Sequence, residues 1–259
     1  MSEETFVKTE RKGNILIVEI NRPEKMNALH PPASKAMGQV FDDFAADKDL
    51  WVAIVTGAGD RAFSAGNDLR YQAEGGEMFQ VESGFGGLTD RYDLFKPVIA
   101  AVNGVAMGGG FEIALACDLI IASDNARFAL PEPKVGLAAL AGGLHRLPRQ
   151  IGLKRAMGMI LTGRHVPAAE GKELGFVNEV VPQAELMETA MKWAEMICDC
   201  SPSSIRTSKE VAMKGLDTAN FEDAYTTRYD AVRRMLKGPD VIEGPMAFAQ
   251  KRKPNWSGE

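Results

Sequence analysis

The stretch from Asn103 to Glu132, NGVAMGGGFEIALACDLIIASDNARFALPE, decides how the chain is organised. Three successive glycines, Gly108 to Gly110, run into an apolar segment whose one charged residue is Glu112. Twenty positions later a second carboxylate, Glu132, stands between two prolines. This arrangement predicts a backbone anion site beside two facing glutamates, which suits chemistry on an activated carbonyl.

The three glycines indicate a backbone that bends sharply or is approached closely, because glycine is otherwise a poor residue with which to begin a helix. Amides at a helix N-terminus point outward without an acceptor, and the helix dipole there favours negative charge. An oxygen that gains charge during a reaction would be stabilised at such a turn. The alternative is a tight strand-to-helix turn without a ligand, and the glycines alone leave both interpretations open.

The two glutamates lie in unusual settings. The run FEIALAC is apolar on every face, so its helix is expected to be buried, and Glu112 in its first turn needs a polar partner. The prolines beside Glu132 stiffen its loop and offer no N–H donors. A salt bridge from Glu112 to an arginine and an exposed turn position for Glu132 are the alternatives to a catalytic role.

Composition excludes several classes of function. The 259 residues are 45% hydrophobic and 25% charged, which is typical of a globular core, and the net charge of −5 argues against nucleic acid or an anionic membrane as partner. The three cysteines and three histidines form no metal-binding pattern, and free thiols suit a reducing compartment. No signal-peptide pattern and no run of 18 apolar residues is present, so a cytoplasmic location is expected.

Hydrophobic periodicity predicts an α/β core followed by helices, with residues 1–200 as the core and 201–259 as a helical C-terminal region. The predicted strands are residues 14–20, 51–56, 97–102, 119–122 and 127–130. The predicted helices are residues 33–47, 154–161, 167–174, 183–200, 203–216, 220–236 and 240–251. The glycine-rich segment 74–91 is either a flexible loop over a site or a disordered connection.

A second glycine turn, Gly66-Asn67-Asp68, follows another strand. If the two strands are neighbours, one backbone N–H from each turn can converge on the same oxygen, as an oxyanion hole requires. The chain lacks the dinucleotide, phosphate-loop and GxSxG patterns at its glycine turns, which disfavours those nucleotide sites and a serine hydrolase.

Six segments together resemble the crotonase (enoyl-CoA hydratase/isomerase) superfamily, in order and over nearly the whole chain: RPEKMNAL, AFSAGNDL, PVIAAVNGVAMGGGFEIALACDLIIAS, FALPEPKVGL, AGGLHRLPRQIG and LTGR. FGGLTD and the tail EGPMAFAQKRKPNWSG look most like its carnitinyl-CoA dehydratase branch. The resemblance implies a spiral of ββα units and C-terminal helices that form a homotrimer or homohexamer. It also implies an acyl-CoA substrate, whose coenzyme A is the only cofactor-like group.

The resemblance also implies the roles of site residues. The N–H groups of Asn67 and Gly109 correspond to the oxyanion hole, and Glu112 and Glu132 to the pair found in the hydratases. Because many relatives with other chemistries lack one glutamate, both together favour hydration or dehydration of an acyl-CoA. Since the helix dipole favours ionised Glu112, we expect Glu112 to activate the water and Glu132 to carry the proton to or from C2.

The remaining positions that the resemblance assigns bind coenzyme A. They are Lys25, Met26, Ala28, Ala65 and Leu69 in the coenzyme A groove, with Phe248 and Lys251 reaching the coenzyme A of a neighbouring subunit. Three alternatives stay open. One is a Δ3,Δ2-enoyl-CoA isomerase that uses one base and no water. The others are a non-enzymatic RNA-binding relative, against which the net charge argues, and a purely structural oligomer, against which the presence of both glutamates argues. The acyl group is not specified, although Tyr71, Phe79 and Phe85 are available to line a site for a quaternary ammonium.

Overall fold

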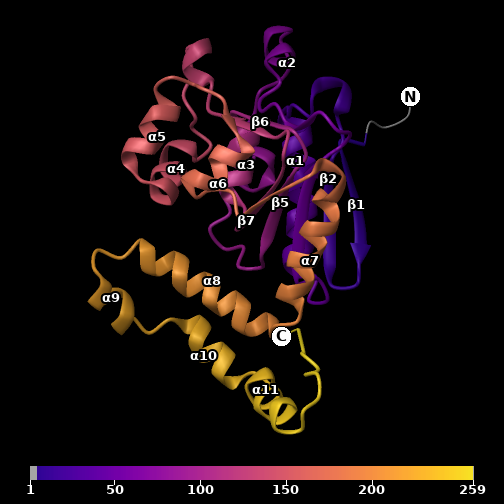
Figure 1. The fold of residues 1–259 in the computed structure, drawn as a ribbon, viewed down its shortest axis with the longest axis vertical. Coiled ribbons are helices and arrows are strands. Elements are labelled where there is room, and N and C mark those ends of the chain that lie inside the picture. Colours follow the sequence, from indigo (N-terminus) through magenta and orange to yellow (C-terminus); the bar gives the residue numbers. More distant parts are fainter. Residues whose placement is uncertain (1–4, 259) are drawn as a thin grey trace.

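Two sheets form the body of the molecule in the computed structural model, which describes residues 5–258 (Figure 1). The larger sheet has the strand order β1-β2-β3-β5-β7-β10 and the smaller the order β4-β6-β8-β9. The larger sheet comprises β1 (Val7–Lys12), β2 (Ile15–Ile20), β3 (Val52–Gly57), β5 (Val98–Val102), β7 (Leu119–Ser123) and β10 (Glu179–Val181). The smaller comprises β4 (Ala62–Ser64), β6 (Val105–Met107), β8 (Arg127–Ala129) and β9 (Val166–Pro167).

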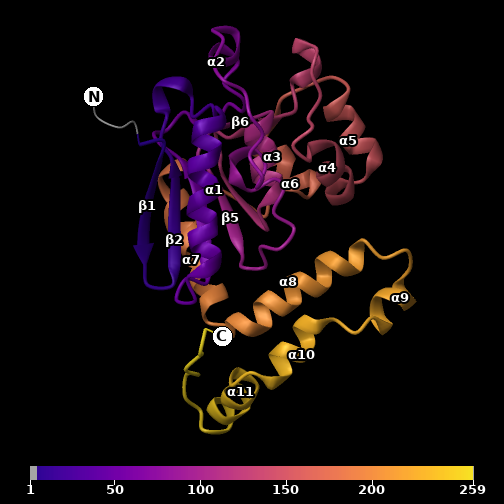
Figure 2. The same cartoon turned by 180° about the vertical axis from the view of Figure 1, so that it is seen from behind.

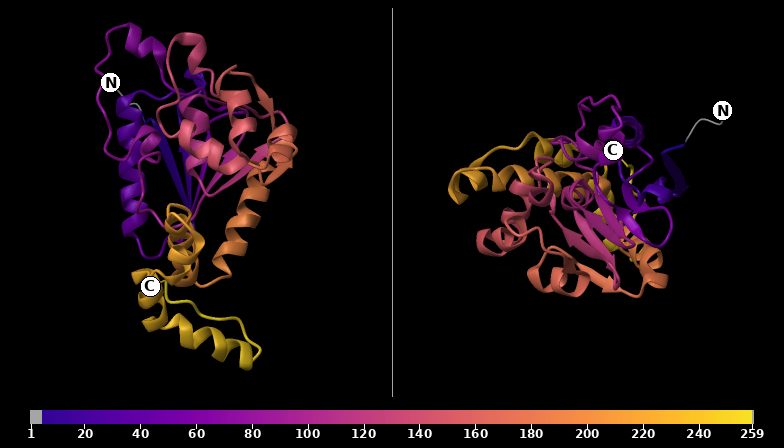
Figure 3. Two further views of the ribbon diagram at one scale, coloured as in Figure 1. Left: turned by 90° about the vertical axis from the view of Figure 1, so that its left-hand side faces the viewer. Right: turned by 90° about the horizontal axis from the view of Figure 1, so that it is seen from above.

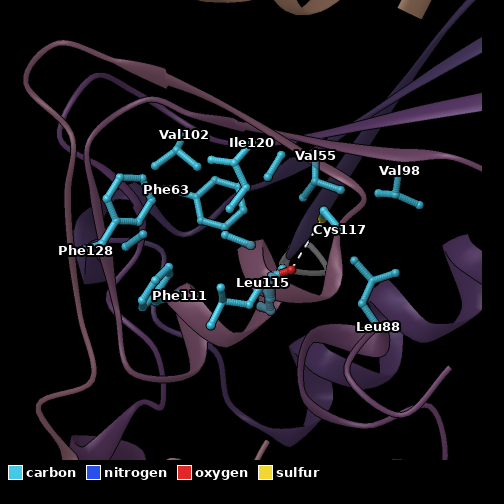
Figure 4. Packing of buried hydrophobic residues seen from close by; sticks show 14 of the residues in the cluster. Val55, Phe63, Leu88, Val98, Val102, Phe111, Leu115, Cys117, Ile120 and Phe128 are labelled. Atoms are coloured by element: carbon cyan, nitrogen blue, oxygen red, sulfur yellow. Dashed lines mark hydrogen bonds between the residues drawn. The ribbon is translucent and has the colours of Figure 1, made fainter. Parts of the chain in front are cut away.

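Helices cover the larger sheet on both faces, with α1 (Pro31–Ala46) on one side and α7 (Leu186–Cys198) on the other (Figure 3). Strands β3 and β5 are buried along their whole length, which explains their continuous apolar sequences, since parallel strands covered on both faces need no polar side. Beneath them, Phe63, Phe111 and Phe128 belong to the main core cluster (Figure 4).

The small sheet determines where the site lies. Strand β6 pairs in parallel with β4 on one side and with β8 on the other. Because the carboxyl ends of parallel strands share one edge, the turn after β4, the turn after β6 and the loop after β8 open together. The condition set by the sequence, that the two glycine turns follow neighbouring strands, is therefore met.

The later helices are α4 (Gly143–Ile151), α5 (Leu153–Ile160), α6 (Ala168–Leu174), α8 (Pro202–Leu216), α9 (Phe221–Thr226), α10 (Asp230–Lys237) and α11 (Asp240–Ala249). Short helices are α2 (Leu69–Ala73) and the 3₁₀ turns η1 (Pro23–Lys25), η2 (Phe85–Gly87), η3 (Glu132–Val135) and η4 (Gln183–Glu185). Helices α8 to α11 lie as an arm below the sheets (Figures 1 and 2). No helix among the described residues is long and apolar enough to cross a membrane.

The prediction of one helix over residues 220–236 is wrong, because the chain breaks between α9 and α10. The hydroxyls of Thr226 and Thr227 donate to carbonyls one turn back, on Glu222 and Asp223. These hydrogen bonds occupy carbonyl oxygens at the C-terminal end of α9. The backbone of Thr227 is no longer helical, with φ −59° and ψ 130°. Five strands were not predicted: β1, whose residues are mostly exposed and polar, the three-residue strands β4, β6 and β10, and the two-residue strand β9.

Candidate active site

The two glycine turns touch each other. Gly66 has a positive φ of 88°, and a Cβ placed on it would lie 2.6 Å from the Met107 carbonyl oxygen and 3.0 Å from the Gly109 nitrogen. Across residues 5–258, neither the Asn67 N–H nor the Gly109 N–H donates a hydrogen bond to a protein acceptor. The two N–H groups predicted to form the oxyanion hole therefore have no protein acceptor among the described residues, and they lie on turns that contact each other.

Glu112 lies in the first turn of α3 (Gly109–Ala116) and is 3% exposed. Its Oε1 accepts a hydrogen bond of 2.8 Å from the N–H of Gly143, the first residue of α4, so the carboxyl faces a second helix N-terminus. Burial raises the pKa of Glu112 to about 7, and the charge of Glu132 acts in the same direction, against the Gly143 and Ala141 amides and Arg146. Burial thus acts against the ionised form of Glu112 that the helix dipole favours, and the role of Glu112 as the base stays a prediction.

Glu132 begins η3, directly above the glycine turn. A Cβ on Gly108 would lie 3.1 Å from Glu132 Oε1, so the carboxyl occupies the space that this glycine leaves free. Its Oε2 is buried and accepts no hydrogen bond from any described residue. Burial raises the pKa of Glu132, as it does for Glu112. The alternatives of an arginine salt bridge for Glu112 and an exposed position for Glu132 both fail.

Two cavities meet at Asn67. One, of about 330 Å³, is lined by Lys25, Met26, Ala28 and Leu69, which the family resemblance assigns to coenzyme A. The other, of about 320 Å³, also has Asn67 in its lining and includes residues of the glycine-rich segment 74–91. We call it the second cavity. The N–H of Ala65 donates to the Met26 carbonyl oxygen (2.9 Å), which joins the first cavity to the glycine turn although Ala65 does not line it.

Phe248 and Lys251 lie far from these cavities within the same chain. Both belong to the end of α11 and the turn after it, at the outer end of the helical arm, away from α2 and α3 (Figures 1 and 2). Phe248 is 87% exposed, so its side chain has almost no support within its own subunit.

Sequence reasoning missed three features of the site. The ring of Phe85 lies against Gly109, where a Cβ would overlap it. Arg22 forms a buried ion pair with Asp68 (3.0 Å), next to Asn67. The glycine pair before α4 supplies the amide that holds Glu112. Two of these features had a signal, since Phe85 was available to line a site and AGGLHRLPRQIG contains a glycine pair, but nothing in the spacing indicated their partners.

The sequence matches the family model described as enoyl-CoA hydratase/isomerase over residues 10–259. The chain belongs to this family. It is 45% identical to a carnitinyl-CoA dehydratase of Escherichia coli over 255 residues, which cover 96% of this chain and 97% of the relative. The predicted family is confirmed, as is the class of enzyme, a hydro-lyase.

Solved structures agree with this membership. An enoyl-CoA hydratase from Mycobacterium tuberculosis matches with a TM-score of 0.93 at 37% identity, over 99% of this chain and all of that one. A carnitinyl-CoA hydratase from Mycobacterium avium matches with a TM-score of 0.79 at 38% identity, over the same shares. The predicted crotonase-like α/β fold is therefore confirmed.

Proposed function

We propose that this enzyme adds water to, or removes it from, the C2–C3 bond of an acyl-CoA thioester, using Asn67, Gly109, Glu112 and Glu132. One observation carries the proposal: two unengaged N–H groups on touching turns lie beside two carboxyl groups whose pKa values are both raised. An oxyanion hole with an acid and a base at neutral pH is what this reaction needs.

In hydration, the thioester oxygen accepts hydrogen bonds from Asn67 and Gly109 and gains charge as the enolate forms. The ionised carboxylate takes a proton from water while the water oxygen bonds to C3. The protonated carboxyl then gives its proton to C2, so the pair ends with its protonation exchanged. Dehydration follows the same steps in reverse.

We assign the negative charge to Glu112 and the proton to Glu132. Glu112 accepts a backbone N–H from Gly143, whereas Glu132 Oε2 has no donor among the described residues. Hydrogen bonds to a carboxylate favour its ionised form. Once Glu132 is protonated, it no longer raises the pKa of Glu112, so this arrangement is self-consistent. Because the two groups titrate as a pair, their apparent pKa values belong to both.

The rest of the assembly follows from the family as proposals. Residues 201–259 would form the oligomerisation region of a homotrimer or homohexamer, in which Phe248 and Lys251 reach a neighbouring coenzyme A. Lys25, Met26, Ala28, Ala65 and Leu69 would hold coenzyme A within the subunit. The enzyme would act in the cytoplasm without a cofactor other than the substrate's own coenzyme A.

The test is hydration of crotonyl-CoA, followed by the loss of absorbance of the conjugated thioester. We expect a loss that depends on enzyme and on both glutamates. No loss of absorbance, with a double-bond shift in a 3-enoyl-CoA instead, would favour the isomerase.

A further inference from the structure

Arg146, on α4, lies beside the turn that holds Glu112, and the mechanism above gives it no role. Its Nη1 donates to the carbonyl oxygen of Ala141 (3.4 Å) and its Nη2 to that of Thr89 (2.7 Å). The side chain is partly buried, and within residues 5–258 it forms no ion pair with a carboxylate. Its positive charge is therefore available to act on groups nearby.

Two adjacent glycines separate the Arg146 guanidinium from the Glu112 carboxyl. Gly142 has a positive φ of 101°, and a Cβ on it would overlap Arg146 Nη1. A Cβ on Gly143 would lie 3.0 Å from Glu112 Oε1, the same oxygen that accepts the Gly143 N–H. Each glycine thus leaves room for one charged group, and the two groups have opposite charges.

Two charged side chains act on Glu112 in opposite directions. Glu132 raises the pKa of Glu112, whereas Arg146 lowers it. An opposite charge nearby favours the ionised form of a carboxyl group, and the ionised form is the one that can take a proton from water. Arg146 therefore favours the protonation state of Glu112 that the proposed reaction requires.

The other groups around α3 do not have this effect. On α3 itself, Cys117 is a buried thiol whose pKa is raised by burial, so it stays neutral. On α4, His145 and Arg149 are exposed to solvent. The elements β4, β6 and η2, which also pack against α3, have no titratable side chain.

The same guanidinium holds the segment that places Phe85 at the glycine turn. Thr89, whose carbonyl oxygen accepts from Arg146, is 1% exposed, and its hydroxyl accepts the N–H of Phe85 (2.8 Å). The Phe85 ring lies against Gly109. A planar guanidinium can bond two carbonyl oxygens in fixed directions, which the single ammonium of a lysine does less well. Arg146 thus connects the turn that holds Glu112 to the segment that packs on the proposed oxyanion hole.

We propose that Arg146 is a positioning residue, which keeps Glu112 ionised for the attack of water and holds the Glu112 turn against the segment 85–89. The inference rests on the proposed function and adds a residue to it. The alternative is a purely structural bond between two loops, without an effect on the ionisation of Glu112.

The test is the pH dependence of kcat/KM for hydration of crotonyl-CoA, whose acid limb reports the ionisation of the base in the free enzyme. Arg146→Gln removes the charge that favours ionised Glu112, so the acid limb should move about half a pH unit or more to higher pH. Arg146→Lys keeps the charge but not the forked contact, so it should lower kcat severalfold and leave the acid limb in place.

Arg149→Gln is the matched control, because Arg149 is an exposed arginine on the same helix that donates to the His145 carbonyl oxygen (3.1 Å) one turn back. It should change neither kcat nor the acid limb. A folded Arg146→Gln enzyme with the acid limb of the wild type would overturn the inference, since a structural bond lowers kcat equally at every pH. If Arg146→Gln does not fold, Arg146→Met, which keeps the aliphatic stem, has the same expected and contrary results. An acid limb that Arg146→Lys moves to higher pH would also overturn the inference.

Failure of the proposed function would look different. An enzyme that hydrates no acyl-CoA would refute the hydratase assignment but leave the ionisation of Glu112 measurable. Infrared titration through the neutral pH range gives it from the carboxyl band that Glu112→Gln removes. A midpoint that Arg146→Gln moves to higher pH supports the inference, and an unchanged midpoint refutes it.

Discussion

Two carboxyl groups that would each be costly to bury alone lie at one point of the molecule. Glu112 is 3% exposed, and Glu132 has an oxygen without a donor among residues 5–258. Neither forms an ion pair within that part of the chain, so local stability does not explain them. The proposed reaction explains them, since it takes one proton from water and gives another to C2, which requires a base and an acid.

The first prediction concerns this pair. Glu112→Gln and Glu132→Gln should each lower kcat at least about a hundredfold with little change in KM, because each keeps the shape but breaks the proton relay. The double variant should lose much less than the product of the two losses, since the residues act as a unit. Steady-state hydration rates test this, with circular dichroism as the control for folding. Wild-type turnover by the Glu112→Gln enzyme would refute the mechanism.

The second prediction concerns stability against pH. The folded-state pKa of Glu112 is about 7, above its ordinary value of 4.5, so between these values the folded state binds more protons than the unfolded state. The free energy of unfolding should therefore fall as pH rises through this window, by about 3 kcal/mol. Glu112→Gln should remove most of this fall and leave the part that comes from Glu132, whose pKa is also raised. Denaturant unfolding at pH 5 and pH 8, at one protein concentration, compares the two proteins, and parallel pH dependences would contradict the assignment.

At the scale of elements, the buried ion pair of Arg22 and Asp68 connects two segments. One is the segment 22–29, part of the proposed coenzyme A site, and the other is the glycine turn Gly66-Asn67-Asp68. Arg22 also donates to the Ala28 carbonyl oxygen, while Asp68 accepts the N–H of Tyr71 (3.1 Å) at the start of α2. The N–H of Asp68 donates to the Leu29 carbonyl oxygen (2.9 Å). The backbone on both sides of Asn67 is thus fixed by the segment that would hold coenzyme A.

The third prediction follows from that connection. Asp68→Asn should destabilise the protein by about 3 kcal/mol, because it leaves Arg22 buried without its partner. It should also lower kcat and raise KM together, since both the hole and the groove lose their support. Glu170→Gln, which breaks the more exposed pair with Arg164, is the control and should change neither constant. A less stable Asp68→Asn enzyme with unchanged kcat and KM would reduce the pair to a purely structural role.

The fourth prediction tests the Gly109 N–H. Gly109→Pro removes the donor at a helix position that tolerates proline, but its Cβ would overlap the Phe85 ring. The informative comparison is therefore between the Phe85→Ala single variant and the Phe85→Ala/Gly109→Pro double variant. The added proline should lower kcat about a hundredfold or more. Equal turnover by the two folded proteins would exclude Gly109 from the hole.

The sequence alone predicted the long helices and strands, but not the contacts that support the candidate site. Strands such as 97–102 and the helix at 203–216 are recognisable because one continuous hydrophobic pattern specifies them. The short strand β6 is set by pairing with β4 and β8, which no local pattern reveals. Likewise Arg22 and Asp68 meet only through the fold.

At the scale of the whole molecule, the helical arm has exposed apolar side chains and a tail that contacts no cavity of its own subunit. Phe248 is 87% exposed, and Lys251 has a positive φ of 53° in the turn that ends α11, where its N–H donates to the Phe248 carbonyl oxygen (3.1 Å). An aromatic side chain this exposed suits a contact with a partner outside the subunit. The proposed partner is the coenzyme A of a neighbouring subunit.

The fifth prediction tests that proposal by point variants. Deleting residues 240–259 would also remove the buried Asp240, whose carboxylate accepts hydrogen bonds from the hydroxyls of Ser201 (2.6 Å) and Ser257 (2.9 Å). A deletion would therefore not separate an effect on coenzyme A binding from an effect on folding. Phe248→Ala with Lys251→Ala should raise the KM for crotonyl-CoA about five- to tenfold and leave kcat nearly unchanged. Phe221→Ala, an equally exposed ring on the same arm, is the control and should not change KM.

Mixing subunits shows whether the tail acts on a neighbour. A Glu112→Gln chain has a dead site and an intact tail, whereas the Phe248→Ala/Lys251→Ala chain has a live site and a defective tail. If the tail completes a neighbour's site, oligomers assembled from both chains contain live sites beside intact tails, and part of the activity returns to the wild-type KM. If each tail serves its own subunit, every live site keeps a defective tail, and the KM stays raised at all mixing ratios. A raised KM that mixing never restores would therefore refute the contribution across subunits while leaving the chemistry of Glu112 and Glu132 intact.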